Sequence, residues 1–236
     1  MRSDAVAPLP LSHRLWAWFE ANQKEALIGA AVVVFAGFVT GYVLWQHGQT
    51  AIAAGDALSQ VAATQFGAAM PLPNPAQAYL AVASKYSGSP AGAEALLLAG
   101  TTLFSEGKYQ EAQAEFERFA REYRDNEFMG DALLGVAASL DAQGKTDQAI
   151  TSYKSLIERH PNDIAVTQAK FALARLYEAQ NKPELARDLY EELERNPYSS
   201  MANDAAMRLE ELAAKHPKLG AAAAAPTSPT FRIEKK

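Results

Sequence analysis

The chain has 236 residues, of which 49% are hydrophobic and 21% are charged, a composition that is typical of a folded protein and excludes a disordered chain. The formal net charge of −5 and the lack of a Lys/Arg cluster argue against nucleic acid as a partner, because phosphate binding needs a concentrated basic surface. With no cysteine, the chain cannot form a disulfide, a thiolate metal site or a lipid-modified cysteine.

Residues 26–45 form a run of twenty residues without a charge or a proline. At about 1.5 Å per residue, a helix of this length matches the roughly 30 Å hydrocarbon layer of a bilayer. Trp16 and Trp18 precede the run, and Tyr42 and Trp45 close it, as is typical of membrane interfaces. The run therefore predicts a single transmembrane helix.

The positive charges near this helix lie before it. Arg2, Arg14 and Lys24 precede the run, and the next Lys or Arg after it is Lys85. Because Lys and Arg are retained on the cytoplasmic side, residues 1–25 are predicted to be a cytoplasmic tail and the rest of the chain to be exported.

A cleaved signal peptide is the alternative interpretation of the same run. Ala51, Ile52 and Ala53 satisfy the small-x-small cleavage rule. The apolar run is longer than the usual signal core of about 7–15 residues, which favours an uncleaved anchor.

Two glycines inside the run, Gly37 and Gly41, form a GxxxG pattern. This pattern allows another membrane helix to approach closely, so it predicts a site of membrane helix packing. The alternative is that glycine is simply frequent in membrane helices.

After the anchor the sequence repeats with a period of 37 residues. Aromatic residues recur at Tyr79, Phe116, Tyr153 and Tyr190, and small residues recur at Ala63, Gly100, Ala137 and Ala174. Several columns in one register indicate stacked structural repeats. Within a unit, apolar residues follow helical spacing on both sides of Gly107, Gly144 or Asn181, residues that tolerate the left-handed backbone of a turn. The prediction is an all-α solenoid of helical hairpins.

These residues resemble the tetratricopeptide repeat (TPR) family. The first clear unit has the consensus pattern at Leu96, Ala99, Gly100, Leu103, Gly107, Tyr109, Ala112 and Phe116, and the next unit has it at Leu133, Val136, Ala137, Leu140, Gly144, Ala149, Tyr153 and Pro161. The third unit departs from it at Lys170 and Pro183, neither of which is expected to abolish the hairpin. The resemblance implies a TPR-like domain over residues 46–217, with a degenerate first repeat and a capping helix over 201–215. Residues 218–236 are expected to be a disordered tail.

The anchor and the repeats together resemble one bacterial family, the ancillary subunit of the Sec translocon. Residues 18–49 carry most of that likeness. The resemblance implies a single-pass inner-membrane protein with a cytoplasmic N-terminus and a periplasmic TPR domain.

The sequence offers little for catalysis. The histidines lie in the N-terminal tail, at the membrane edge and at two helix ends followed by proline, where a solvated role is expected. No HExxH, GxSxG, phosphate-loop or dinucleotide pattern occurs. We therefore expect no enzyme activity, no cofactor and no metal.

The first helices of a TPR solenoid form a concave wall, and we expect the partner there. The positions predicted not to pack against the repeat's own second helix are Leu97, Thr101, Phe104, Leu134, Ala138, Asp141, Phe171, Arg175 and Glu178. Recurrent large apolar residues on an open surface suggest a groove for a partner helix or an unfolded segment. The alternative is that superhelical packing or the chain's own terminal helix covers them.

Two classes of function follow. One is a membrane-anchored module near the translocon that binds exported chains or a periplasmic chaperone. The other is a structural scaffold of an envelope machine for outer-membrane assembly or cell division.

Overall fold

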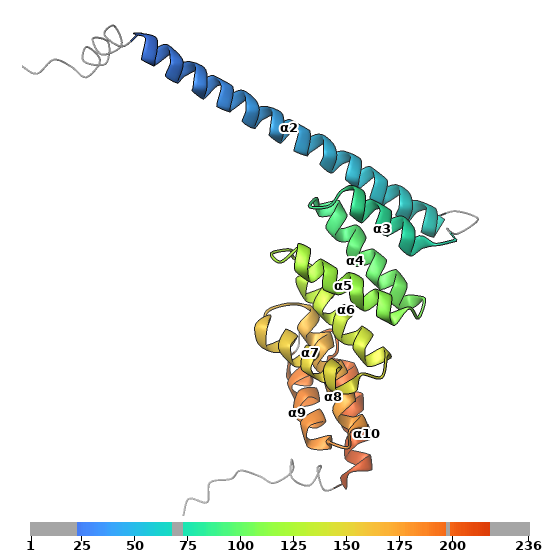
Figure 1. Ribbon diagram of the computed structural model, residues 1–236. Coiled ribbons are helices and arrows are strands. Elements are labelled where there is room, and N and C mark those ends of the chain that lie inside the picture. The colour runs from blue at the N-terminus through green and yellow to red at the C-terminus, as the bar shows by residue number, and fades with distance from the viewer. Residues whose placement is uncertain (1–22, 68–72, 197–198, 218–236) are drawn as a thin grey trace, which may run out of the picture. The chain divides into compact units, whose positions relative to one another are not determined.

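The computed structural model of the protein describes residues 23–67, 73–196 and 199–217. Every regular element in these ranges is an α-helix (Figure 1), which confirms the predicted all-α class. The elements are α2 (Gln23–Gly67), α3 (Pro75–Lys85), α4 (Pro90–Ser105), α5 (Tyr109–Glu122), α6 (Met129–Ala142), α7 (Thr146–Arg159), α8 (Ala165–Ala179), α9 (Pro183–Arg195) and α10 (Ala202–Lys215). The predictions for the tail before residue 23 and for residues 218–236 lie outside the described residues.

The chain divides into two units, Met1–Ala53 and Ala54–Lys236. In the first unit, the described large apolar side chains of α2 are exposed, Val32, Val33, Val34 and Phe35 each by 62–72%. Over the part of the chain that the structure describes, no helix meets the length and hydropathy needed to cross a membrane. Several residues of the predicted span, such as Leu27 and Val43, have side chains that lie outside the described set.

The second unit is a stack of antiparallel helical hairpins (Figure 1). The clear repeats pair α4 with α5, α6 with α7 and α8 with α9, and α10 packs on α9. The aromatic column at the 37-residue step is buried, because Tyr79, Phe116, Tyr153 and Tyr190 are each at most 4% exposed. Repeat packing therefore follows the register that the sequence predicts.

The column of small residues marks where the two helices of a hairpin meet. Gly100, Ala137 and Ala174 are buried, whereas Ala63 is exposed. The helices α4 and α6 both approach Phe116 of α5: a Cβ added at Gly100 would lie 2.7 Å from its ring, and one added at Gly135 would lie 2.6 Å from it. Such distances are too short for carbon atoms, so the ring needs glycine on both sides.

The predicted turns are present. Gly107, Gly144 and Asn181 have positive φ angles of 77°, 75° and 56°, which L side chains other than Asn and Asp seldom adopt. At each turn the next residue's N–H donates to a carbonyl of the first helix, as in the 2.9 Å bond from Lys108 to Leu103. These bonds close the ends of α4, α6 and α8.

The third repeat keeps its hairpin despite the two departures from the TPR pattern. Lys170 Nζ donates to Glu192 Oε1 at 2.6 Å and so ties α8 to α9. Pro183 is the first residue of α9, where its missing N–H is not needed. The expectation that neither residue abolishes the hairpin is confirmed.

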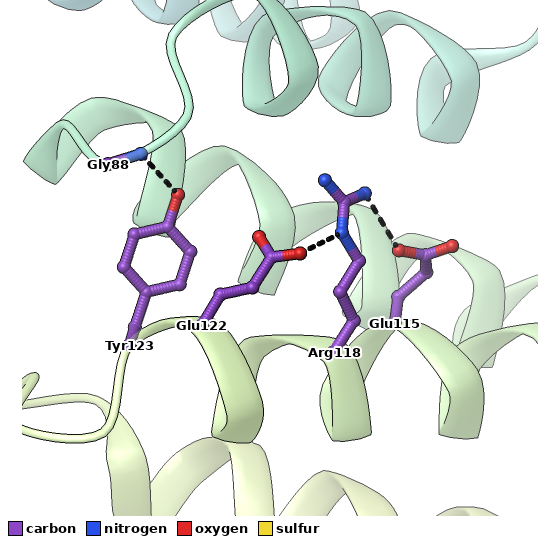
Figure 2. Close-up of polar contacts among 5 residues, drawn as sticks. All are labelled: Gly88, Glu115, Arg118, Glu122 and Tyr123. Atoms are coloured by element: carbon purple, nitrogen blue, oxygen red, sulfur yellow. Dashed lines mark hydrogen bonds and ion pairs between the residues drawn. The ribbon is translucent and has the colours of Figure 1, made fainter.

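Polar contacts of α5 and the residue after it are shown in Figure 2. Arg118 lies between two glutamates of its own helix, with Nε 2.8 Å from Glu122 Oε1 and Nη1 3.5 Å from Glu115 Oε2. The Tyr123 hydroxyl accepts a hydrogen bond from the Gly88 N–H at 3.1 Å. The first set joins residues three and four positions apart on one helix, and the second fastens the α3–α4 loop to the next hairpin.

Candidate functional site: a groove between two first helices

The first helices of two successive repeats, α4 and α6, enclose an open pocket of about 410 Å³. We call it the α4–α6 groove. It is lined by Leu97, Thr101 and Phe104 of α4, by Asp131, Leu134, Gly135 and Ala138 of α6, by Phe116 of α5 and by Gln168 of α8. Most of the lining is apolar, so the groove fits apolar side chains of a partner.

The residues that α4 contributes to the groove lie on one face of that helix. Leu97, Thr101 and Phe104 are four and three residues apart on α4, and neighbours at these spacings share a face. Thr101 is exposed, and its hydroxyl donates back to the Leu97 carbonyl at 3.0 Å. The polar atom of the wall is therefore satisfied within its own helix.

The opposite wall depends on small residues. Gly135 and Ala138 leave room beside Leu134, so that the Phe116 ring, which is 4% exposed, forms the floor between α4 and α6. A larger residue at position 135 would collide with the ring. The groove thus exists because two repeats meet over a single aromatic side chain.

The sequence matches two family models of tetratricopeptide repeats. A family model described as "Tetratricopeptide repeat-like domain" matches residues 16–160, which is more than half of the chain. The chain belongs to this family. A second tetratricopeptide repeat model matches residues 134–200, so family matches cover all three clear repeats.

Solved structures with a similar fold were also found. A tetratricopeptide repeat protein from Parabacteroides merdae is 18% identical, with a TM-score of 0.49 over 73% of this chain and 62% of that chain. PcrH in complex with the chaperone binding region of PopD is 20% identical, with a TM-score of 0.44 over 52% and 91%. The MamA protein is 17% identical, with a TM-score of 0.46 over 77% and 100%. No curated protein matches the sequence.

The TPR fold is typically a non-catalytic scaffold, and stacked TPR hairpins present an extended concave surface for protein partners. This chain is accordingly a TPR-like protein–protein interaction module. Among the described residues, no group of three His, Asp or Glu side chains is placed to hold a metal ion.

Five of the nine predicted partner-binding residues line the α4–α6 groove: Leu97, Thr101, Phe104, Leu134 and Ala138. The other four, Asp141, Phe171, Arg175 and Glu178, do not line it. Sequence reasoning did not single out Asp131, Gly135 or Gln168. The available signal was the repeat register, because Glu94, Asp131 and Gln168 are successive members of one 37-residue column.

The structure contradicts one prediction, namely that Phe104 and Phe171 do not pack against the second helix of their own hairpin. The Phe104 ring packs edge-on against Tyr109 with 5.1 Å between ring centroids, and the Phe171 ring packs in the same way against Tyr190 at 5.5 Å. An aromatic side chain is long enough to reach the neighbouring helix from a position whose Cβ points elsewhere.

Glu178 forms a hydrogen bond with a buried residue of its own hairpin. The buried Tyr190 hydroxyl donates to Glu178 Oε1 at 2.5 Å. Burial, and then this hydrogen bond, raise the pKa of Tyr190 well above its usual range, so the phenol stays a donor. Burial, and then the nearby Asp141 carboxylate, likewise raise the pKa of Tyr153, and Arg175 opposes this effect.

Gly37 and Gly41 lie on the exposed apolar part of α2. A Cβ added at either position would meet no atom within 4 Å. Their predicted role in membrane helix packing stays a prediction.

Proposed function

We propose that this chain is a membrane-anchored periplasmic TPR module of a bacterial inner membrane, without enzyme activity. It binds apolar segments of exported chains, or of a periplasmic chaperone, beside the protein translocation machinery. The observation that carries the binding part of the proposal is the α4–α6 groove, which is open and mostly apolar.

The groove supports binding of an apolar segment because its walls retain unburied apolar area. Leu97, Phe104 and Leu134 are each only partly buried. Full burial of one such side chain is worth about 1.5–3 kcal/mol. Because these side chains are already partly buried, a partner gains only the remaining fraction from each, so it has to cover all three and bury apolar area of its own to bind specifically and reversibly.

The membrane anchor is supported by the pattern of α2 in the first unit. Val32, Val33, Val34 and Phe35 are consecutive and exposed, and consecutive helical positions point about 100° apart. Their apolar side chains therefore surround the helix, which is the property of a helix buried on all sides, as in a bilayer. The sequence of residues 26–45 adds the length and the lack of charge.

Association with the translocation machinery rests on the resemblance of residues 18–49 to the ancillary Sec subunit family. An anchored TPR domain on the exported side would meet chains as they emerge. Isolation of the full chain in mild detergent, followed by identification of cross-linked partners at the groove, tests this part. Recovery of outer-membrane assembly or cell-division proteins instead would favour the scaffold alternative.

Binding can be tested by filling the groove. The probe is a fluorescent peptide with a core of leucine and phenylalanine flanked by glutamine, and its anisotropy is measured with the full chain in detergent. Thr101→Trp is expected to weaken binding by at least ten-fold, because the indole takes up the pocket that the peptide would enter.

A matched control lies on a second helix. Thr151 of α7 is exposed and donates to the Asp147 carbonyl at 2.9 Å, as Thr101 does to Leu97. Thr151→Trp is expected to leave binding unchanged. Equal loss in both variants, or none in either, would show that the groove is not the binding site.

The membrane topology is tested separately. A protease added to spheroplasts is expected to digest the repeats and to leave a membrane-bound N-terminal fragment, since Lys24 and the other nearby positive charges precede the span. Protection of the repeats, or a soluble mature chain that begins near Ala54, would contradict the anchor.

A further inference from the structure

We infer that the α4–α6 groove selects apolar segments that carry a lysine or arginine next to the apolar side chains, and that Asp131 binds this cation. The inference rests on the proposed function of the groove and names the chemistry of its partner. It concerns the acidic residue of the lining.

Asp131 lies on the same face of α6 as the apolar wall. It precedes Leu134 by three residues and Ala138 by seven, and all three line the groove. At about 1.5 Å per residue, its position along the helix axis is roughly 5 Å from Leu134 and 10 Å from Ala138. A partner that places an apolar side chain on Leu134 therefore brings its adjacent residues to the Asp131 carboxylate.

The charge of Asp131 is not balanced within the described structure. The lining of the groove contains no Lys, Arg or His, and among the described residues Asp131 has neither an ion pair nor a hydrogen bond from its side chain. Arg175, the cation singled out on the wall of the third repeat, does not line the groove.

A second carboxylate strengthens the negative potential. Asp163 interacts electrostatically with Asp131, and its Oδ1 accepts the Ala165 N–H at 2.9 Å. Gly130 makes this placement possible, because a Cβ at that position would collide with the Asp163 carboxylate. Burial, and then Asp163, raise the pKa of Asp131, and a positive charge beside the carboxylate would oppose both effects.

The partner chemistry follows from these contacts. A segment that brings a cation to Asp131, which is an exposed residue, gains an ion pair, whereas one that brings a carboxylate meets two acids. Apolar area provides affinity for both, so the charge decides between segments of equal hydrophobicity.

The test compares three peptides with the same leucine and phenylalanine core, flanked by lysine, glutamine or glutamate. The full chain in detergent is expected to bind the lysine peptide about two-fold to five-fold more tightly than the glutamine peptide, and the glutamate peptide more weakly than either. The preference is expected to shrink as salt rises from about 0.05 to about 0.5 M, because the Debye length falls from roughly 14 Å to roughly 4 Å.

Asp131→Asn removes the charge with little change in shape and is expected to abolish the preference while retaining binding of the glutamine peptide. Asp204→Asn is the matched control, because Asp131 and Asp204 both lie in the first turn of a helix, α6 and α10 respectively. Asp204→Asn is expected to keep the preference of the parent chain.

The outcomes separate the two proposals. If all three peptides bind equally, or if Asp131→Asn keeps the preference, the cation site is overturned and the apolar groove stands. If no peptide binds the parent chain, both proposals fail.

Discussion

Phe116 shows how a single residue shapes the groove. Its ring belongs to the second helix of one repeat, yet it lies against glycines of two first helices, Gly100 and Gly135. The ring is thus part of the hydrophobic core and also the floor of the α4–α6 groove. Changes at the two glycines act on both roles, because a Cβ added at either position would overlap the ring.

We predict that Gly100→Leu lowers the free energy of unfolding of the second unit by about 1–3 kcal/mol or more, because a side chain at this position overpacks the Phe116 ring. Ala137→Leu is expected to act in the same way, since Ala137 is fully buried. Thermal and denaturant unfolding measure the effect. Ala114→Leu adds the same bulk at an exposed position of α5 and is expected to change stability by less than about 0.5 kcal/mol. A Gly100→Leu variant as stable as this control would contradict the packing described above.

The ionisation of Asp131 predicts a pH dependence. The folded-state pKa of this carboxyl is raised by burial and by Asp163, so the folded state binds the proton more tightly than the unfolded state does. Stability from this group is therefore present at acidic pH and is lost as the pH rises through the folded-state pKa. We expect Asp131→Asn to melt at the same temperature as the parent or a few degrees higher at pH 7, and this gain to vanish in acid. The quantity to compare is the melting temperature of Asp131→Asn minus that of the parent. If this difference were smaller at pH 7 than at acidic pH, the prediction would be wrong.

At the scale of elements, the hairpin turn is the unit that repeats. Gly107, Gly144 and Asn181 occupy one position with one left-handed conformation, and the backbone bonds after them close the first helix. No atom lies within 4 Å of a Cβ added at Gly107 or Gly144. The requirement for glycine is thus one of backbone conformation and not of space.

Because backbone conformation and not space is what these turns require, substitutions at equivalent turns are expected to change stability in opposite directions. Gly144→Ala is expected to cost about 1 kcal/mol, because an alanine must adopt a positive φ angle. Asn181→Gly is expected to be neutral or slightly stabilising, since glycine accepts the φ of 56° more easily than asparagine. Denaturant unfolding of both variants measures the difference. Equal effects of the same sign would mean that the side chain of Asn181 has a role beyond the turn.

At the scale of the whole molecule, the second unit, Ala54–Lys236, has its own hydrophobic core. Leu58 of α2 packs with Tyr79, Val82 and Leu96 in one cluster, and Leu212 of α10 packs into the cluster of the last repeats. Both ends of the stack are therefore covered by a helix, as a solenoid requires.

We predict that a fragment of residues 54–217 folds alone as a helical unit with cooperative unfolding. A fragment of residues 73–217 lacks Leu58 and is expected to be less stable by at least about 2 kcal/mol, because Tyr79 and Val82 lose their cover. Circular dichroism with thermal unfolding compares the two. A longer fragment that is unfolded, or two fragments of equal stability, would contradict this role of α2.

The sequence by itself determined the repeat architecture. The 37-residue step placed Tyr79, Phe116, Tyr153 and Tyr190 in the core and put turns at Gly107, Gly144 and Asn181, and the structure confirms both. Such features could be predicted because packing within a hairpin follows from helical periodicity and from the backbone freedom of glycine and asparagine, which are local properties.

Only the tertiary structure decided which side chains meet in the α4–α6 groove. Asp131 and Gln168 join Leu97 there, while Phe171 and Glu178 of the third repeat are held by Tyr190. Contacts between repeats depend on how far each hairpin rotates relative to the one before it, and that rotation is set by the sizes of packed residues such as Phe116 and Gly135. No pattern within one helix contains this information, because it arises where residues far apart in the chain fill the same space.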